Sequence, residues 1–279
     1  MNYKEECPVC TRKEELVLFD WRDYNIIHCN NCLLDYCSKM DIKEAGGNSS
    51  PVHIEGIEMM AKSLYITSDL AIQYASKRAA IFTSLLNRKC KNILEIGCGP
   101  GVFYNAFKKK SIEWTGIDIN PYWKKFGEKN KIPISNKSLN SLSQKYDVII
   151  AYQVIEHVEN PLLFIKEIVS KLKPGGIVQL ELPNQNSLSS KIRKLSPKIS
   201  YDYGFIQPPM HLRAYQTKTI KYLFDMVNLK TKNLFACSNT DKLWGQVRKY
   251  SLSQKLFYSS SGKIGLGSLI IAIGQKVNK

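Results

Sequence analysis

A glycine-rich turn next to an acidic residue is the part of the sequence with the clearest chemistry. The stretch LEIGCGPG places Gly97, Gly99 and Gly101 directly after an apolar run, and a helix-like segment follows. The N–H groups of such a turn, with the N-terminus of the following helix, can receive a carboxylate or a phosphate. Glu95 would repel a pyrophosphate, which disfavours a dinucleotide. It suits a ligand with positive charge, and S-adenosylmethionine carries both an ammonium and a sulfonium.

A second acid, Asp118, ends the next apolar run in the stretch GIDIN. In related nucleotide-binding folds, a carboxylate after the second strand accepts hydrogen bonds from the ribose hydroxyls. Asp118 is therefore expected to bind the ribose of the same ligand.

Four cysteines near the N-terminus have the spacing of a zinc ribbon. CPVC and CNNC form C-x2-C, eighteen residues and C-x2-C, with Cys7, Cys10, Cys29 and Cys32 as the ligands. Two such pairs close a tetrahedral Zn²⁺ site. The segment between them alternates like a short hairpin, which so small a module could hardly stabilise without metal. A closed four-cysteine site has no open position for catalysis, so the zinc is expected to be structural.

The charge of the chain is unevenly distributed. Residues 1–60 hold 6 Lys/Arg and 11 Asp/Glu, whereas residues 184–279 hold 16 Lys/Arg and 3 Asp/Glu, within a net charge of +16. An acidic zinc module would repel nucleic acid, which favours a scaffold that covers the active-site mouth or contacts a protein. The basic C-terminal third favours an anionic substrate, an anionic membrane surface or nucleic acid, or it reflects a Lys-rich composition without function.

The location of the protein follows from what the sequence lacks. No apolar run approaches the ~20 residues of a membrane span, and the N-terminal MNYKEECPVC is charged where a signal peptide would be apolar. We therefore expect a cytoplasmic protein whose cysteines are reduced.

Strand-like and helix-like segments alternate along the rest of the chain. Strands are expected at 92–96, 114–118, 146–151, 176–182, 230–237 and 267–276, and helices at 57–87, 102–110, 121–129, 161–172 and 218–229. This order predicts an α/β fold with a doubly wound, Rossmann-like sheet of seven strands, preceded by the small zinc-ribbon module.

The domain organisation follows from these segments. We expect the zinc-ribbon module over 1–45, a linker with leading helices over 46–90, and one α/β domain over 91–279. Within that domain, 184–212 and 238–262 are expected to be insertions on the substrate side.

The chain resembles the class I S-adenosylmethionine-dependent methyltransferases. LEIGCGPG, GIDIN, YDVIIAYQVIEHVENP and LKPGGIVQLELPN occur in the order and at the spacing of that family, over roughly residues 75–183. The resemblance implies that Glu95 and the three glycines line the methionine portion and that Asp118 binds ribose. It also implies contacts from Leu139 and Asn140 beside adenine, from Tyr152 and Gln153 that close the pocket, and from Ile119 next to Asp118.

Glu156 and His157 in QVIEHVENP, with His211 in QPPMHLRAY, admit three interpretations. Glu156 and His157 could begin a helix, with Glu156 capping it or paired. Alternatively, the ubiquinone-pathway O-methyltransferases and the small-RNA 3′-end methyltransferases resemble this pattern and hold a divalent ion with such acids and histidines, although Gln153 stands where their first acid would be. Finally, His157 or His211 could be a metal-free general base that removes a hydroxyl proton.

The segment 184–212 is expected to recognise the substrate. Leu188, Ile192, Leu195 and Ile199 fall at helical spacing with basic residues between them, which is typical of a lid helix, of a gate for an anionic substrate or of a membrane-surface helix. The motif LPN…PPMHLRAYQTKTIKYLF resembles methyltransferases of bacterial surface-glycan and sugar biosynthesis. The expected acceptor is therefore a hydroxyl of a sugar, nucleotide-sugar or lipid-linked glycan. An RNA methyltransferase that uses the basic C-terminal third is the alternative, and a non-catalytic adaptor built on the zinc module is a further one.

Overall fold

The computed structural model describes residues 5–14, 17–21, 24–37, 68–195, 203–207, 211–238 and 251–277. Residues 46–67 of the segment expected to be a linker with leading helices lie outside these residues, as do Ile199 and residues 239–250 of the expected insertion at 238–262. Within the described part of the chain, no helix is long and apolar enough to cross a membrane.

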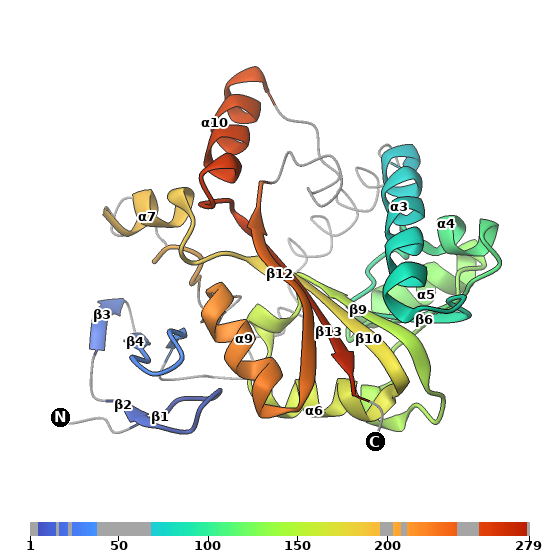
Figure 1. The fold of residues 1–279 in the computed structure, drawn as a ribbon, viewed down its shortest axis with the longest axis horizontal. Coiled ribbons are helices and arrows are strands. Elements are labelled where there is room, and N and C mark those ends of the chain that lie inside the picture. Colours follow the sequence, from blue (N-terminus) through green and yellow to red (C-terminus); the bar gives the residue numbers. More distant parts are fainter. Residues whose placement is uncertain are drawn as a thin grey trace.

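A seven-stranded sheet forms the centre of the molecule (Figure 1), in the order β12-β13-β10-β9-β6-β7-β8. The strands are β6 (Asn92–Ile96), β7 (Glu113–Ile117), β8 (Ile134–Ser135), β9 (Tyr146–Tyr152), β10 (Leu172–Pro183), β12 (Leu229–Cys237) and β13 (Leu269–Lys276). β13 is antiparallel to both of its neighbours, β10 and β12, and the other six strands share one direction. The carboxyl ends of the other strands therefore meet at one edge, where open α/β sheets bind their ligands.

Helices cover both faces of the sheet (Figure 1). On one face, α3 (Ser68–Leu86), α4 (Tyr104–Lys109) and α5 (Pro121–Asn130) share a core with the strands through residues such as Phe82, Phe107 and Trp123. On the other face, α6 (Pro161–Lys171) and α9 (Thr217–Met226) bury an apolar stripe that includes Ile165 and Leu223. The doubly wound, seven-stranded fold that the sequence predicts is thus confirmed.

The N-terminal residues 5–37, here called the cysteine module, contain short strands. These are β1 (Glu5–Glu6), β2 (Lys13–Glu14), β3 (Val17–Trp21), β4 (Tyr24–His28) and β5 (Asp35–Cys37). The β3–β4 pair is the hairpin expected between the two cysteine pairs. The α/β domain completes the module's sheet, because β11 (Arg213–Ala214) pairs with β5 in the order β11-β5-β4-β3. The sequence pattern did not predict that a strand of the α/β domain is added to the sheet of the module.

Three further elements follow the carboxyl ends of strands in the central sheet. They are the single-turn helix η2 (Ile155–His157) after β9, the helix α7 (Leu188–Leu195) after β10, and the helix α10 (Leu252–Lys263) after β12. A second single-turn helix, η1 (Leu139–Ser141), precedes β9 and packs against α6. The η2 turn corrects one interpretation of the sequence. Glu156 and His157 do not begin the following helix, because α6 begins at Pro161, where the Asn160 side chain accepts a hydrogen bond from the N–H of Leu163.

Candidate active site

The glycine-rich turn lies at the carboxyl end of β6 and has the backbone conformation that favours glycine. Gly97, Gly99 and Gly101 have φ angles of 65°, 51° and 69°. A Cβ on Gly97 would lie 2.5 Å from Val154 Cγ2, so this position has no room for a side chain. Among the residues that the structure describes, a Cβ on Gly99 would meet only Trp123, at 4.0 Å. The turn is therefore a cradle whose middle is accessible to a ligand.

Asp118, directly after β7, is held against this turn. Its Oδ2 accepts a hydrogen bond from the N–H of Gly99 at 2.9 Å, and its Oδ1 accepts one from the N–H of Asn120 at 2.9 Å. Burial raises the pKa of Asp118, while the two backbone N–H groups oppose the shift. Each oxygen keeps a further lone pair for a ligand hydroxyl. The neighbouring Ile119 exposes 78% of its surface, which offers an apolar patch beside the same carboxylate.

Glu95, near the end of β6, is a buried carboxyl group. It is 5% exposed, and its Oε2 accepts a hydrogen bond from the indole Nε1 of Trp114 at 2.8 Å. Burial raises the pKa of Glu95 to about 8, against the opposing effect of this hydrogen bond. A cation bound nearby would favour the charged form.

Arg78 on α3 forms a buried ion pair at the same edge, and the sequence pattern did not identify it. Its Nη2 lies 2.6 Å from Glu181 Oε2 on β10, and its guanidinium stacks over Tyr152, 4.5 Å from the ring centroid. The Tyr74 hydroxyl accepts a hydrogen bond from the same guanidinium. The available signal was the position of Arg78 on the apolar stripe of its helix, four residues after Tyr74. The helical periodicity gives no indication of its partner on β10.

The other residues expected to contact the cofactor lie in different surroundings. Gln153 has a positive φ of 55°, and its N–H donates to the carbonyl oxygen of Glu181 at 2.8 Å, which fixes the chain just beyond β9. Leu139 is buried in η1. Asn140 is exposed, and its Nδ2 donates to Glu167 Oε1 on α6 at 2.5 Å. Leu139 is part of the buried cluster that includes Ile165 of α6, and the side chain of Asn140 also turns toward α6.

Glu156, His157 and His211, here called the Glu–His cluster, converge beyond the end of β9. One potential ligand atom from each lies within 4.8 Å of the others, and the two imidazole centroids are 4.8 Å apart. The backbone brings His211 here, because the N–H of Leu212 donates to the carbonyl oxygen of Glu156 at 3.0 Å. His211 Nδ1 lies 3.0 Å from the carbonyl oxygen of Phe205. A carbonyl oxygen can only accept, so Nδ1 carries the hydrogen.

Glu156 is a buried acid beyond the carboxyl end of β9. It is 1% exposed, and neither carboxylate oxygen accepts a hydrogen bond from another residue that the structure describes. Burial raises the pKa of Glu156 to about 8. Such a group is stabilised in its charged form by a cation that reaches it. The donor set of one carboxylate and two imidazoles therefore fits a divalent ion.

The four cysteines that the spacing predicts as ligands come together in the cysteine module. Cys7 Sγ lies 3.5 Å from Cys32 Sγ, Cys10 Sγ lies 3.4 Å from Cys29 Sγ, and all four sulfurs are within 4.8 Å of one another. The Zn–S length of about 2.3 Å places the sulfurs of a tetrahedral site about 3.8 Å apart, so the donor set fits Zn²⁺. Both turns have the same local geometry, with positive φ at Thr11 and Leu33.

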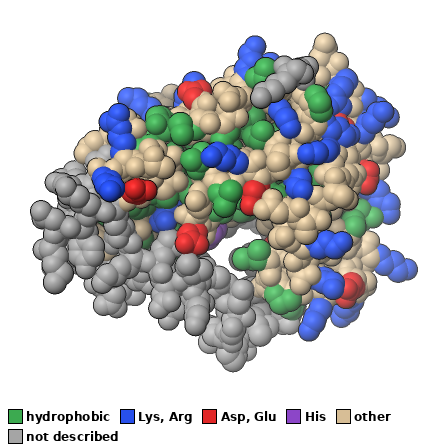
Figure 2. Space-filling view, turned by 90° about the horizontal axis from the view of Figure 1, so that it is seen from below, with side chains coloured by type: hydrophobic (Ala, Val, Ile, Leu, Met, Phe, Trp, Pro, Cys, Tyr) green, Lys and Arg blue, Asp and Glu red, His purple; other side chains and the backbone are tan. Residues whose placement is uncertain are grey.

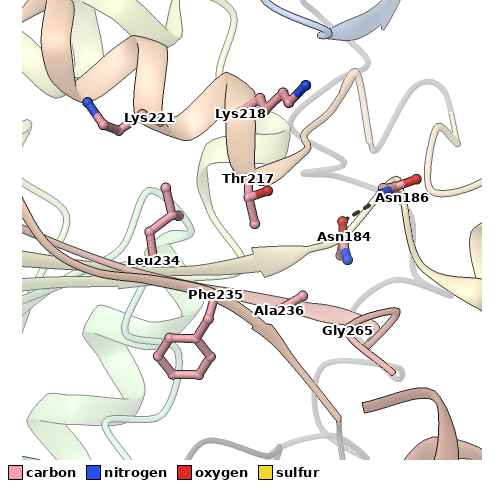
Figure 3. A pocket seen from close by; sticks show the side chains of 9 residues that line it. All are labelled: Asn184, Asn186, Thr217, Lys218, Lys221, Leu234, Phe235, Ala236 and Gly265. Carbon is pink, nitrogen blue, oxygen red and sulfur yellow. Dashed lines mark hydrogen bonds between the residues drawn. The ribbon is translucent and has the colours of Figure 1, made fainter. Parts of the chain in front are cut away.

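A pocket of about 410 Å³ lies at the carboxyl edge of the sheet, between the start of α9 and the ends of β10 and β12 (Figure 3). Asn184 and Asn186 line it from the β10 side, and Lys218 and Lys221 line it from α9. Lys221 also forms an ion pair with Asp225, at 2.5 Å. Of its lining residues, Asn184 and Asn186 belong to the segment 184–212 that is expected on the substrate side.

The fold and the cradle define the class of the protein: it is an S-adenosylmethionine-dependent methyltransferase of class I. Residues 68–233 match the family model described as a methyltransferase domain, and the chain belongs to this family. The ubiquinone biosynthesis O-methyltransferase of Histophilus somni is 26% identical over 220 residues, which cover 67% of this chain and 86% of that protein. The protein of the same description from Coxiella burnetii is 26% identical over 165 residues, with 53% and 68% covered.

Solved structures share the fold at low sequence identity. The plantazolicin methyltransferase BpumL, in complex with SAH, superposes with a TM-score of 0.56 at 16% identity and covers 82% of this chain and 91% of its own. A SAM-dependent methyltransferase from Archaeoglobus fulgidus gives a TM-score of 0.50 at 21% identity, covering 74% and 94%. The predicted methyltransferase class is thus confirmed, whereas these relatives give no support to a sugar or glycan acceptor.

Asp118→Ala is expected to weaken S-adenosylmethionine binding about 10- to 100-fold. The change removes an acceptor for the ribose hydroxyls, and hydrogen bonds to a charged group contribute about 1.5–3 kcal/mol each. Isothermal titration of S-adenosylmethionine into the purified variant measures the change. Glu128→Ala, on the exposed surface of α5, is the control and should bind like the wild type. Unchanged affinity in Asp118→Ala would show that the ribose is bound elsewhere.

Cys29→Ser is expected to abolish stoichiometric zinc binding and to destabilise the cysteine module, because three thiolates leave the tetrahedral site incomplete. Elemental analysis of the purified protein measures the zinc, and hydrogen exchange of the β4 and β5 amides measures local stability. Cys37→Ala is the matched control, since Cys37 is buried in the same module but is not one of the four clustered cysteines. A wild-type protein without zinc would contradict the assignment.

Proposed function

We propose that the protein transfers the methyl group of S-adenosylmethionine to a hydroxyl of a small molecule held at the Glu–His cluster. The single observation that carries the proposal is the convergence of Glu156, His157 and His211 within 4.8 Å, just beyond the carboxyl end of β9. The cofactor cradle ends the neighbouring strand β6, so both sites open at the same edge. The names of the O-methyltransferase relatives support oxygen as the acceptor atom.

The cofactor is proposed to bind as the sequence predicts. The ligand lies over the Cα of Gly99, whose N–H is held by Asp118, and the spare lone pairs of Asp118 accept from the ribose hydroxyls. Glu95 and the Arg78–Glu181 pair lie beneath the methionine end, where buried carboxylates favour the positively charged sulfonium. Tyr152 is fixed by the guanidinium of Arg78 and closes the cofactor site.

The chemical step is an in-line displacement, so the chain mainly aligns the reactants and excludes water. The acceptor oxygen attacks the methyl carbon, the carbon–sulfur bond breaks, and S-adenosylhomocysteine leaves as a neutral sulfide. His211 keeps its hydrogen on Nδ1, so Nε2 of the neutral ring is the atom that can take the hydroxyl proton. Alternatively, Glu156, His157 and His211 would hold a divalent ion, with Nε2 of His211 as a ligand and no longer as a base, and that ion would lower the pKa of the hydroxyl.

The acceptor is proposed to be a small molecule with an anionic group. The pocket beside α9 offers Lys218 and the paired Lys221 for such a group, together with the amide side chain of Asn186 (Figure 3). A hydroxyl on a sugar, nucleotide-sugar or lipid-linked glycan satisfies this description, as does a ring hydroxyl on an acid. The structural zinc at the four cysteines is part of the same proposal and has no direct role in the reaction.

The RNA alternative is supported only by the charge of the C-terminal third. Figure 2 shows Lys and Arg side chains spread over one face of the molecule, with acidic side chains between them, rather than gathered into one stripe. A phosphate backbone is bound best by a continuous basic track. The non-catalytic adaptor is disfavoured by the intact glycine cradle and by the match to the methyltransferase family.

Incubation of the protein with methyl-labelled S-adenosylmethionine and a fractionated cell extract tests the acceptor class. Label is expected in small molecules, and the labelled product should resist mild base if an ether has formed. Synthetic catechols, hydroxybenzoates and nucleotide-sugars then separate ring hydroxyls from sugar hydroxyls. Label in RNA would overturn the proposal, and the absence of label from every fraction would favour the adaptor.

Glu156→Gln is expected to reduce kcat about 100-fold or more while S-adenosylmethionine binding is unchanged, because the change removes the carboxyl group that would hold the ion in the cluster. EDTA, added under conditions in which the cysteine-bound zinc is retained, should have a similar effect on the wild type. Activity that is insensitive to EDTA but lost in His211→Ala would assign the step to a metal-free base.

The same variant should also change the pH dependence of stability. The folded-state pKa of Glu156, about 8, lies above its ordinary value of 4.5, so the folded chain holds a proton that the unfolded chain has released. The wild type should therefore lose about 1.4 kcal/mol of unfolding free energy, relative to Glu156→Gln, for each pH unit from about 5 to 8. Denaturant unfolding of both proteins without added divalent ions measures this difference, and Mn²⁺ at pH 9 should stabilise only the wild type. Parallel pH profiles would show that Glu156 is not held in its neutral form.

A further inference from the structure

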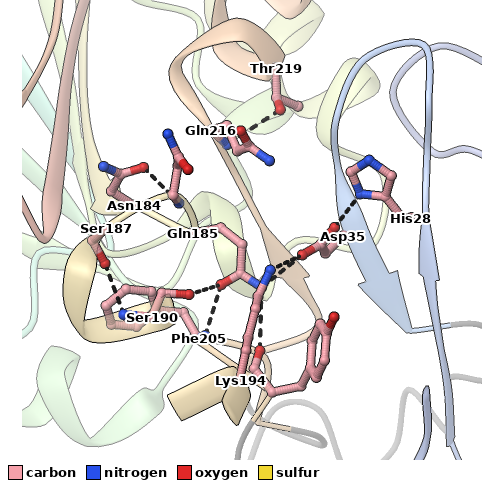
Figure 4. A network of polar contacts seen from close by, with 12 residues as sticks. His28, Asp35, Asn184, Gln185, Ser187, Ser190, Lys194, Phe205, Gln216 and Thr219 are labelled. Atoms are coloured by element: carbon pink, nitrogen blue, oxygen red, sulfur yellow. Dashed lines mark hydrogen bonds and ion pairs between the residues drawn. The ribbon is translucent and has the colours of Figure 1, made fainter. Parts of the chain in front are cut away.

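Asp35 of the cysteine module is a buried carboxylate with partners from three different segments (Figure 4). It is 1% exposed, and its Oδ1 lies 2.6 Å from His28 Nδ1. Its Oδ2 accepts from Gln185 Nε2 at 2.8 Å and from Lys194 Nζ at 2.9 Å. Burial raises the pKa of Asp35, but His28 and Lys194 lower it to below its ordinary value, so the carboxylate is charged and can only accept.

This carboxylate determines the orientation of the Gln185 side chain. Because Asp35 can only accept, the NH₂ group of Gln185 must face it, and the amide oxygen must face the other way. That oxygen, Oε1, accepts from the N–H of Phe205 at 2.9 Å and from Ser190 Oγ at 3.0 Å. Gly204 permits this approach, since a Cβ there would lie 2.5 Å from Gln185 Oε1.

The backbone of Phe205 continues the connection to the Glu–His cluster. Its carbonyl oxygen accepts from His211 Nδ1 at 3.0 Å, and this hydrogen bond sets the tautomer of the imidazole. Two hydrogen bonds therefore connect Asp35 through Gln185 to the N–H of Phe205, and a third connects the carbonyl oxygen of Phe205 to His211. The backbone of Phe205 joins the two parts. A histidine that acts through one nitrogen is commonly oriented by a partner on the other.

We propose that Asp35 is a positioning residue for His211, which it holds in one tautomer through Gln185 and the backbone of Phe205. The inference rests on the proposed function of His211, and it assigns the cysteine module a part in the acceptor site. Asp35 touches neither reactant. Its role is to fix the orientation of the group that does.

The test combines Asp35→Ala with a readout that needs no substrate. The ¹⁵N chemical shifts of the imidazoles, in protein that keeps its zinc and has no added divalent ion, report the tautomer of each of the four histidines in the sequence. His211→Gln assigns the relevant signals. The wild type should show one His211 tautomer, protonated on Nδ1, and Asp35→Ala should show a mixture.

Kinetics on the same proteins test whether this orientation matters. Asp35→Ala should lower kcat at least 10-fold, with KM for S-adenosylmethionine within 2-fold of wild type. In a His211→Ala background the same change should cost less than 2-fold, because residues that act through one group are not additive. Asp35→Asn is the conservative control: His28 can switch tautomer and accept from the new amide, so the acceptor for Gln185 is retained and kcat should recover to within about 3-fold.

Gln185→Met provides the second variant if Asp35→Ala fails to fold. It breaks the connection but leaves His28 and Lys194 on Asp35, and it should give the same mixed tautomer. A single unchanged tautomer in the folded variant overturns the proposal, as does an equal loss of kcat in the His211→Ala background. A mixed tautomer combined with full activity of His211→Ala would instead overturn the proposed function of His211.

Discussion

The backbone of Leu212 joins the parts of the acceptor site. Its N–H donates to the carbonyl oxygen of Glu156 in η2, and its carbonyl oxygen accepts from the N–H of Cys37 in the cysteine module at 3.1 Å. Arg213 then extends this contact into a ladder by pairing with Tyr36. Because these bonds fix the direction of the chain on both sides, the preceding residue, His211, has little freedom. The geometry of the Glu–His cluster thus depends on a backbone junction rather than on side chains alone.

Three buried acids lie at the carboxyl edge of the sheet, and the cost of ionising them selects what can bind there. Glu181 has a cationic partner in Arg78, and Glu95 accepts a hydrogen bond from the neutral indole of Trp114. Glu156 has no hydrogen-bond partner among the described residues. Desolvation raises the pKa of all three acids. A sulfonium or a divalent ion relieves this cost, whereas an anionic cofactor would increase it. The charge of the donor is therefore encoded in the unbalanced acids and not in the glycine turn alone.

The features that the sequence predicts are those with a local pattern. The strand at 92–96, the glycine turn and the two C-x2-C pairs each lie within a few residues, and their positions agree with the structure. The features that it does not predict join distant segments. Gln185 lies 150 residues from Asp35, and Arg78 lies 103 residues from Glu181. Hydrophobic periodicity indicates which side of an element is buried but not which element covers it, so neither contact was predictable.

A structural metal can influence a reaction that it does not touch. The cysteine module is too small for a core of its own, and its apolar residues Ile27, Leu34 and Tyr36 belong to the same buried cluster as Ile155 and Tyr215 of the α/β domain. Zinc would fix the two turns that flank the β3–β4 hairpin, and the hairpin in turn supports β5 and its partner β11. Because β11 begins two residues after His211, order at the four cysteines reaches the acceptor site through paired backbone. Loss of a bound zinc ion should therefore affect the orientation of the acceptor more than the affinity for the methyl donor. The glycine turn and Asp118 follow strands β6 and β7, and neither of these strands pairs with the cysteine module.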